Sequence, residues 1–166
     1  MQVIFLDIDG VLYTKRSGLA FAYAIERRNA TPCDEERVKA FDVEAVKNLG
    51  ELVYMTGAQI VVSSTWRLRA NLYVLRELFR NLPFAHTLLD TTGEQRTTRA
   101  EEVLAWLLSH PGITSFVIID DMLDGLDSTF PDHFVKCDAG RGFGNRAAFD
   151  LALSILHRTD GGTPHV

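Results

Sequence analysis

The sequence has 166 residues, of which 46% are hydrophobic and 23% charged, which suits one globular domain and excludes a disordered or fibrous chain. Its net charge of −5 excludes the general affinity for nucleic-acid backbones of a strongly basic domain, although a local basic patch could still hold a nucleic-acid end. No apolar run approaches the ~18 residues of a membrane span, the N-terminus is unlike a signal peptide, and two distant cysteines indicate free thiols. We therefore expect a cytoplasmic protein without membrane association, as a monomer or a homodimer.

Short apolar runs alternate with segments of helical periodicity along the chain. In order, they predict a strand over 3–6, a short helix over 20–28, a helix over 42–57, a strand over 59–62, a helix over 66–81, a weaker strand over 84–89, a helix over 98–110, strands over 115–119 and 133–136, and a helix over 145–157. This alternation predicts an α/β, Rossmann-like fold, with a parallel five-stranded sheet and helices on both faces. We expect residues 1–157 to form one domain and 158–166 a disordered tail.

Two of the predicted helices carry clear end signals. Asp42 can cap the helix that follows it, Phe41 and Val46 can pack across that cap, and Gly57 is a natural stop. Thr98 and Glu101 have the spacing of a capping box, in which each side chain bonds the backbone of the other residue. Arg99 then takes the first position of the helix.

Polar side chains end three of the predicted strands. Asp7 and Asp9 follow the first strand, Ser63 the second, and Asp120 with Asp121 the fourth. In open parallel sheets the ligand binds beyond the carboxyl ends of the strands, so these side chains should gather at one edge.

The carboxylates in this set predict a metal-assisted phosphoryl-transfer site. Four close carboxylates repel one another, and oxygen-only ligands suit Mg²⁺, so we expect Asp7, Asp9, Asp120 and Asp121 to hold that ion. Asp7 is then the candidate nucleophile and Asp9 the candidate acid and base, because their side chains share a face in extended geometry. Arg99 lies at a helix N-terminus, where charge and backbone both favour an anion.

The same residues resemble the motifs of the haloacid dehalogenase (HAD) superfamily. The segment FLDIDGVL at 5–12 is similar to its first motif, 61–63 to the second and 117–121 to the fourth. The resemblance covers most of the chain and implies a phosphatase that forms an aspartyl-phosphate on Asp7, with Asp9 as acid and base. It further implies Asp120 as a metal ligand, assisted by Asp121 or Asp124, and the backbone carbonyl of Asp9 as another.

The third motif departs from the superfamily, because the Lys usual there is missing. Arg99 is the best replacement and Arg96 the second. The run SSTWR at 63–67, with Arg99 and the later motifs, resembles more loosely the HAD domain of multidomain RNA-repair proteins, which suggests a polynucleotide 5′- or 3′-phosphatase. We expect Ser63, Ser64, Arg67 and Arg99 to bind the substrate phosphate. Ser63 could instead cap the next helix, and Arg67 could be a solvated helix residue.

Other features leave alternatives open. The intervals between motifs leave no room for a second core, so we expect no large cap domain, and the open site admits a bulky substrate or a lid from a partner subunit. A small-molecule phosphatase and a non-catalytic binding module of the same fold are the alternatives to a polynucleotide phosphatase. One face of the helix predicted over 66–81 carries three arginines and a tyrosine: Arg69, Tyr73, Arg76 and Arg80. Such a face could bind nucleic acid but is more typical of a solvated surface. Trp66 and Trp106 are expected to be packing residues.

Overall fold

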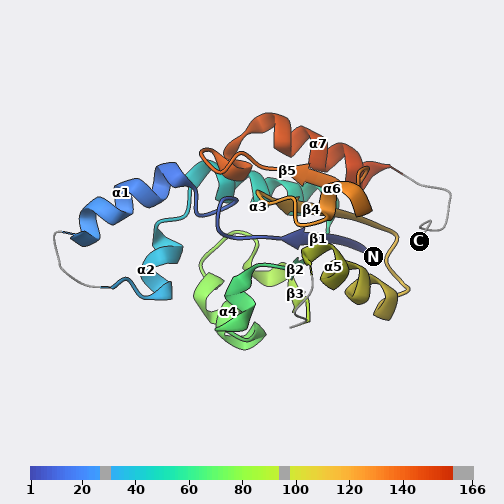
Figure 1. The fold of residues 1–166 in the computed structure, drawn as a ribbon, viewed down its shortest axis with the longest axis horizontal. Helices are drawn as coiled ribbons and strands as arrows, with labels where there is room; N and C mark the ends of the chain where they lie inside the picture. Colours follow the sequence, from blue (N-terminus) through green and yellow to red (C-terminus); the bar gives the residue numbers. More distant parts are fainter. Residues whose placement is uncertain (27–30, 94–97, 159–166) are drawn as a thin grey trace.

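The computed structural model describes residues 1–26, 31–93 and 98–158, which fold around one five-stranded parallel sheet (Figure 1). The strands are β1 (Gln2–Leu6), β2 (Gln59–Val62), β3 (Leu88–Thr91), β4 (Ser115–Asp120) and β5 (Phe134–Lys136). Their order across the sheet is β3-β2-β1-β4-β5, which places β1 at the centre between two parallel neighbours. The predicted α/β fold with five parallel strands is confirmed.

Helices cover both faces of this sheet. They are α1 (Lys15–Glu26), α2 (Asp34–Lys39), α3 (Val43–Thr56), α4 (Leu72–Phe79), α5 (Arg99–Ser109), α6 (Leu126–Thr129) and α7 (Arg146–His157). One apolar core lies between the sheet and α3 with α7, and a smaller one lies between the other face and α5 with α6. In Figure 1, α1 projects away from the sheet on the side opposite the N-terminus of β1.

The central strand alternates between these two cores. Ile4 and Leu6 enter the larger core, whereas Val3 and Phe5 enter the smaller one beside Trp106, and these four of the five β1 side chains are fully buried. Because side chains alternate along a strand, Asp7 continues the face of Phe5, toward α5. The backbone N–H of Asp7 still donates to the carbonyl of Ile119, at 3.0 Å, so the sheet fixes the start of the polar segment.

Local end signals operate as the sequence predicts. The Asp42 side chain accepts bonds from the N–H groups of Glu44 and Ala45, and Gly57 ends α3 with a φ of 67°. Thr98 and Glu101 form the predicted capping box at the start of α5. Each of these contacts joins residues no more than four positions apart in the sequence, which explains why they could be predicted without the tertiary structure.

The segment between β2 and β3 differs from its prediction. In place of one helix over 66–81, a 3-10 turn (Thr65–Leu68) is followed by α4, because the Asn71 side chain caps a new helix by accepting from the N–H of Val74 at 3.1 Å. The strand predicted over 84–89 begins only at Leu88, since the residues before it form a second 3-10 turn (Ala85–Thr87). A third such turn, Gly142–Gly144, precedes α7.

The N-terminal helices also differ. The helix predicted over 20–28 begins at Lys15, because Thr14 and Ser17 exchange backbone-to-hydroxyl bonds at 3.1 Å that start α1 earlier; residues 27 and 28 lie outside the described part of the chain. The short helix α2 was not predicted. The predicted tail lies outside the described residues except for Arg158. None of the helices in the described ranges is long and apolar enough to cross a membrane.

The predicted basic face is partly solvated, as Tyr73 is 72% exposed, and partly engaged in contacts within the protein. The Arg69 guanidinium lies 4.7 Å from the centre of the Trp66 ring and pairs with Asp34, and Arg76 donates to the carbonyl of Leu88. Arg80 directly follows α4 and pairs with Glu77 of that helix. Because α4 begins after Arg69, the four residues do not share one helix.

Candidate active site

Three carboxylates meet at the carboxyl edge of the sheet. One oxygen from each of Asp7, Asp120 and Asp121 lies within 4.8 Å of the other two. Asp7 follows β1 and is 5% exposed, Asp120 ends β4 and is fully buried, and Asp121 is partly exposed. The predicted gathering of strand-end acids therefore holds for these three residues, which β1 and β4 bring together as adjacent strands.

Gly10 makes room for this cluster. Its φ is +81°, and a Cβ built on it would lie 2.2 Å from Cγ of Asp121. A side chain at this position would therefore be strained and would also displace a carboxylate of the cluster.

Arg99 is the cation that faces the cluster. Its Nη1 atom donates to Asp7 Oδ1 at 3.1 Å and to Asp120 Oδ2 at 2.7 Å. The start of α5 is held in place there, because the backbone N–H of Arg99 donates to the Asp124 carboxylate at 2.8 Å. The alternative, Arg96, lies outside the described residues. Asp124 thus contacts the backbone of Arg99 and is not one of the three clustered carboxylates.

The cluster carries more negative charge than Arg99 offsets. Burial and the neighbouring Asp7 carboxylate together raise the pKa of Asp120 to about 7, although Arg99 opposes both effects. Burial and Asp7 also raise the pKa of Asp121. For Arg99, burial lowers the pKa, but the attraction of Asp120 and Asp7 outweighs it and the net shift is upward. A divalent cation would relieve this repulsion, and three carboxylate donors fit a hard ion.

Asp9 stands apart from the cluster, which corrects the prediction of four gathered carboxylates. Among the described residues, the group that could hold a metal comprises only the three aspartates already named. The Oδ2 atom of Asp9 accepts a hydrogen bond from the indole Nε1 of Trp66 at 2.9 Å. The chain turns directly after Asp9, where the Gly10 N–H donates to the carbonyl of Tyr13 at 2.8 Å. The Asp9 carbonyl as a ligand stays a prediction.

The two predicted serines occupy different environments. Ser63 follows β2, its N–H bonds the carbonyl of Leu6 beside the Asp7 strand end, and its buried Oγ has no hydrogen-bond partner in the structure. Ser64 Oγ accepts from the N–H of Trp66, so Ser64 is the residue that caps the 3-10 turn. A buried hydroxyl without a partner is rare in proteins, so Ser63 remains available for a ligand.

Arg67 is an interior residue rather than a solvated one. Its Nη1 donates to the carbonyls of Ser63 and Ser64 at 2.7 and 2.8 Å, and its Nη2 pairs with Glu102 on α5. The side chains of this pair are 5% and 6% exposed. Burial lowers the pKa of Arg67 and raises that of Glu102, so the pair is held against a desolvation cost. Among the described residues, the Arg67 Nε has no hydrogen-bond partner, and phosphate binding by Arg67 stays a prediction.

Two residues of this region were missed from the sequence. Trp66 is fully buried as predicted, yet its indole N–H also contacts Asp9. The local sequence does not indicate the role of Glu102, because its partner Arg67 lies 35 residues away. Trp106 is buried as predicted, and its indole donates to Asp90 at 2.7 Å.

Comparison with known proteins assigns the chain to a family. Residues 3–148 match the family described as the HAD domain in Swiss Army Knife RNA repair proteins. The chain belongs to this family. Among HAD proteins of solved structure, it is similar to a haloacid dehalogenase-like family hydrolase from Streptococcus pneumoniae, with 15% identity, 89% of this chain and 88% of that chain covered, and a TM-score of 0.47. A comparison with curated proteins gave no match.

Membership in this HAD family confirms the resemblance drawn from the sequence motifs, and it places the chain among HAD-type hydrolases. The sheet and its flanking helices have the Rossmann-like HAD arrangement, and the described residues contain no large cap domain over the carboxyl edge of the sheet. Asp7, Asp120 and Asp121 form the cluster and Arg99 bonds two of them, while the catalytic roles of these residues and of Asp9 stay predictions.

Proposed function

We propose that this HAD domain is a Mg²⁺-dependent phosphomonoesterase that acts through an aspartyl-phosphate on Asp7, with phosphorylated polynucleotide ends as its substrates. The observation that carries the proposal is the position of Asp7, which lies beside two further carboxylates and 3.1 Å from Arg99. A carboxylate nucleophile next to a metal-type ligand group and a guanidinium is suited to attack on a phosphate.

The residues divide the work as follows. Asp7, Asp120 and Asp121 would hold Mg²⁺, which when bound neutralises the charge of the cluster and of the phosphate. Arg99 and the free hydroxyl of Ser63 are placed to donate hydrogen bonds to phosphate oxygens.

Two displacements complete the reaction. A carboxylate oxygen of Asp7 forms a bond to phosphorus while the bond to the leaving oxygen breaks, and Asp9 gives its proton to that oxygen. In the second step Asp9 takes a proton from water as the water oxygen bonds to phosphorus. The Asp7–phosphorus bond then breaks and releases inorganic phosphate, so Asp7 returns as a carboxylate.

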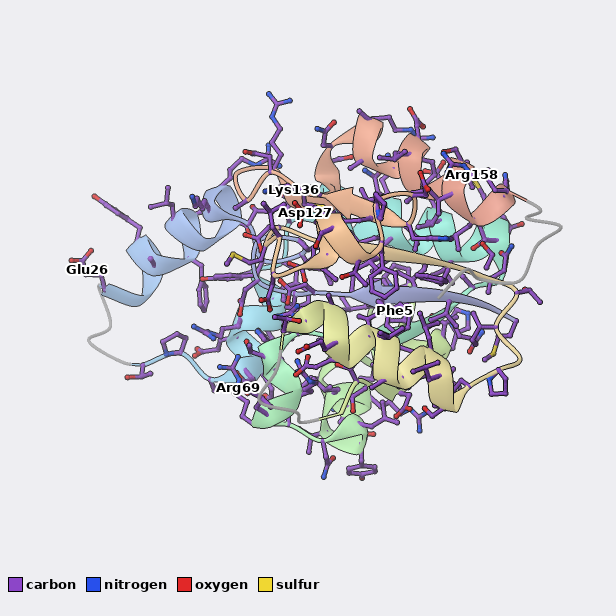
Figure 2. All side chains as sticks on the ribbon, turned by 45° about the vertical axis from the view of Figure 1, so that its right-hand side comes forward. Phe5, Glu26, Arg69, Asp127, Lys136 and Arg158 are labelled. Atoms are coloured by element: carbon purple, nitrogen blue, oxygen red, sulfur yellow. The ribbon has the colours of Figure 1, made fainter. Side chains whose placement is uncertain are left out.

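Two observations favour a polynucleotide end as the substrate. The matching family is described by its occurrence in RNA repair proteins. The described part of the chain also has no large cap that would enclose a small substrate, so the site stays open to a bulky one. Figure 2 shows Arg69 and Lys136 toward the end of the sheet from which α1 projects, and Lys136 Nζ donates to the backbone carbonyl of Asp121 at 3.1 Å.

The test is phosphate release with Mg²⁺ from a panel of substrates: p-nitrophenyl phosphate, mononucleotides, and 5′- and 3′-phosphorylated RNA and DNA oligonucleotides. We expect release from the oligonucleotides and its loss in Asp7→Asn, which keeps the size of the side chain. Preference for mononucleotides would favour a small-molecule phosphatase instead. No release from any substrate by folded protein would contradict the phosphatase proposal and favour a binding module.

A further inference from the structure

Asp9 and Trp66 form a contact between the first motif and the turn after β2. The distance from Trp66 Nε1 to Asp9 Oδ2 is 2.9 Å, although the residues are 57 positions apart in the chain. Among the described residues, Trp66 is the one protein donor for which a hydrogen bond to the Asp9 carboxylate is seen. The orientation of Asp9 therefore depends on the position of this indole.

The indole itself is held tightly. Trp66 is fully buried, with its ring centre 5.9 Å from that of Phe41 and 6.5 Å from that of Phe79. The Arg69 guanidinium covers the ring at 4.7 Å. A packed aromatic ring with a fixed N–H is a rigid donor, in contrast to a flexible surface side chain.

The chemistry of the bond selects one oxygen of Asp9 for proton transfer. Indole N–H is a donor only, so Oδ2 must present a lone pair to it whether Asp9 is ionised or protonated. A carbonyl oxygen is a stronger acceptor than a protonated one, so the protonated form of Asp9 carries its proton on Oδ1, from which it can pass to a leaving group. The bond thus fixes which oxygen faces the substrate without requiring a change of charge.

We infer that Trp66 is a positioning residue for leaving-group protonation, a role that rests on the proposed phosphatase function. It acts through Asp9 and does not itself touch the substrate. Loss of its N–H would let the Asp9 carboxylate rotate, so that protonation of the leaving oxygen is slowed while attack by Asp7 is not.

This role predicts a dependence on the leaving group that a merely structural role would not produce. A good leaving group such as 2,4-dinitrophenolate departs without a proton, whereas an alkoxide requires one. For Trp66→Phe, we expect kcat/KM to fall about 10- to 100-fold with an alkyl phosphate, because the variant loses only part of the rate that a general acid contributes. With 2,4-dinitrophenyl phosphate, kcat/KM should stay within about threefold of the wild-type value. The ratio kcat/KM is the proper readout, because it reports the steps up to the first displacement.

The chain offers a matched control in Trp106→Phe. Trp106 is also buried, and its indole also donates to an aspartate, Asp90 on β3, at 2.7 Å. Both variants lose one indole-to-carboxylate bond and a similar volume, but only Trp66 contacts Asp9. We expect similar losses of thermal stability in the two variants, and equal effects on all leaving groups in Trp106→Phe.

Several outcomes decide the question. An equal fall in kcat/KM for every leaving group in Trp66→Phe, or no fall for the alkyl phosphate, would overturn the inference about Trp66. The phosphatase proposal would still stand in that case, provided that wild-type activity is present and is lost in Asp7→Asn. Inactive wild-type protein, or Asp7→Asn with full activity, would refute both. If Trp66→Phe fails to fold, Phe41→Leu loosens the indole without removing it and should show the same selectivity at smaller amplitude.

Discussion

Substitution of Gly10 by Ala should damage the carboxylate cluster far more than it damages the fold. The φ of +81° costs a residue with a Cβ roughly 1–2 kcal/mol, which in a chain of this size corresponds to a melting temperature about 2–8 °C lower. The new Cβ would also lie 2.2 Å from Asp121 Cγ, where ordinary contacts begin at 3.4 Å, so Asp121 would have to move by about 1 Å. A displacement of that size in a catalytic group lowers activity on the order of 100-fold.

Gly57→Ala is the matched control for backbone strain. Gly57 has a φ of +67°, but a Cβ there would meet nothing within 4 Å. Both variants should therefore lose similar stability in thermal unfolding followed by circular dichroism. Only Gly10→Ala should release phosphate slowly and need more Mg²⁺ for half-maximal rate.

Two results would refute this reasoning. Gly10→Ala with wild-type rate and Mg²⁺ dependence would show that Asp121 does not need its present position. An equal loss of activity in Gly57→Ala would show that the effect comes from general destabilisation and not from the contact with Asp121.

Three further predictions concern the same edge of the sheet. Removal of Mg²⁺ with EDTA should abolish phosphate release. Adding Mg²⁺ at 100 times its dissociation constant should raise the unfolding free energy by about 2.7 kcal/mol in wild type and by less in Asp121→Asn. A melting temperature that Mg²⁺ leaves unchanged would contradict the metal site. Arg99→Met should reduce kcat/KM about 100- to 1,000-fold because Arg99 is the cation placed for the phosphate, with Arg76→Met as a control that should keep the wild-type rate. Arg67→Met should lower the unfolding free energy by roughly 2–4 kcal/mol in urea titrations, because Glu102 and two backbone carbonyls lose a buried donor. Unchanged stability together with a raised KM would instead identify Arg67 as a direct phosphate ligand.

The fold was predictable where its signals are local. The caps at Asp42 and Thr98 act on backbone groups two or three residues away, so the sequence around them is sufficient. The helix predicted over 66–81 was wrong in part, because apolar periodicity does not show that the Asn71 side chain caps a new helix within this segment. The early start of α1 has the same cause, since hydroxyl-to-backbone bonds at Thr14 override a weak apolar pattern.

The candidate site was predictable where strand topology alone determines it. Parallel strands bring their carboxyl ends to one edge, and so Asp7 and Asp120 could be placed together without knowledge of packing. The sequence rule failed for Asp9, because its carboxylate bonds the indole of Trp66, 57 residues away, and does not join the cluster.

The sequence by itself therefore determined the sheet, the strand-end acids and the arginine at the start of α5, since these follow from periodicity and helix caps. Only the tertiary structure decided that Trp66 holds Asp9 and that Arg67 joins the Ser63 loop to Glu102. Those contacts join segments from different elements across a packed core. Their existence depends on how α5 and the turn after β2 settle on the sheet, and no local pattern encodes that arrangement.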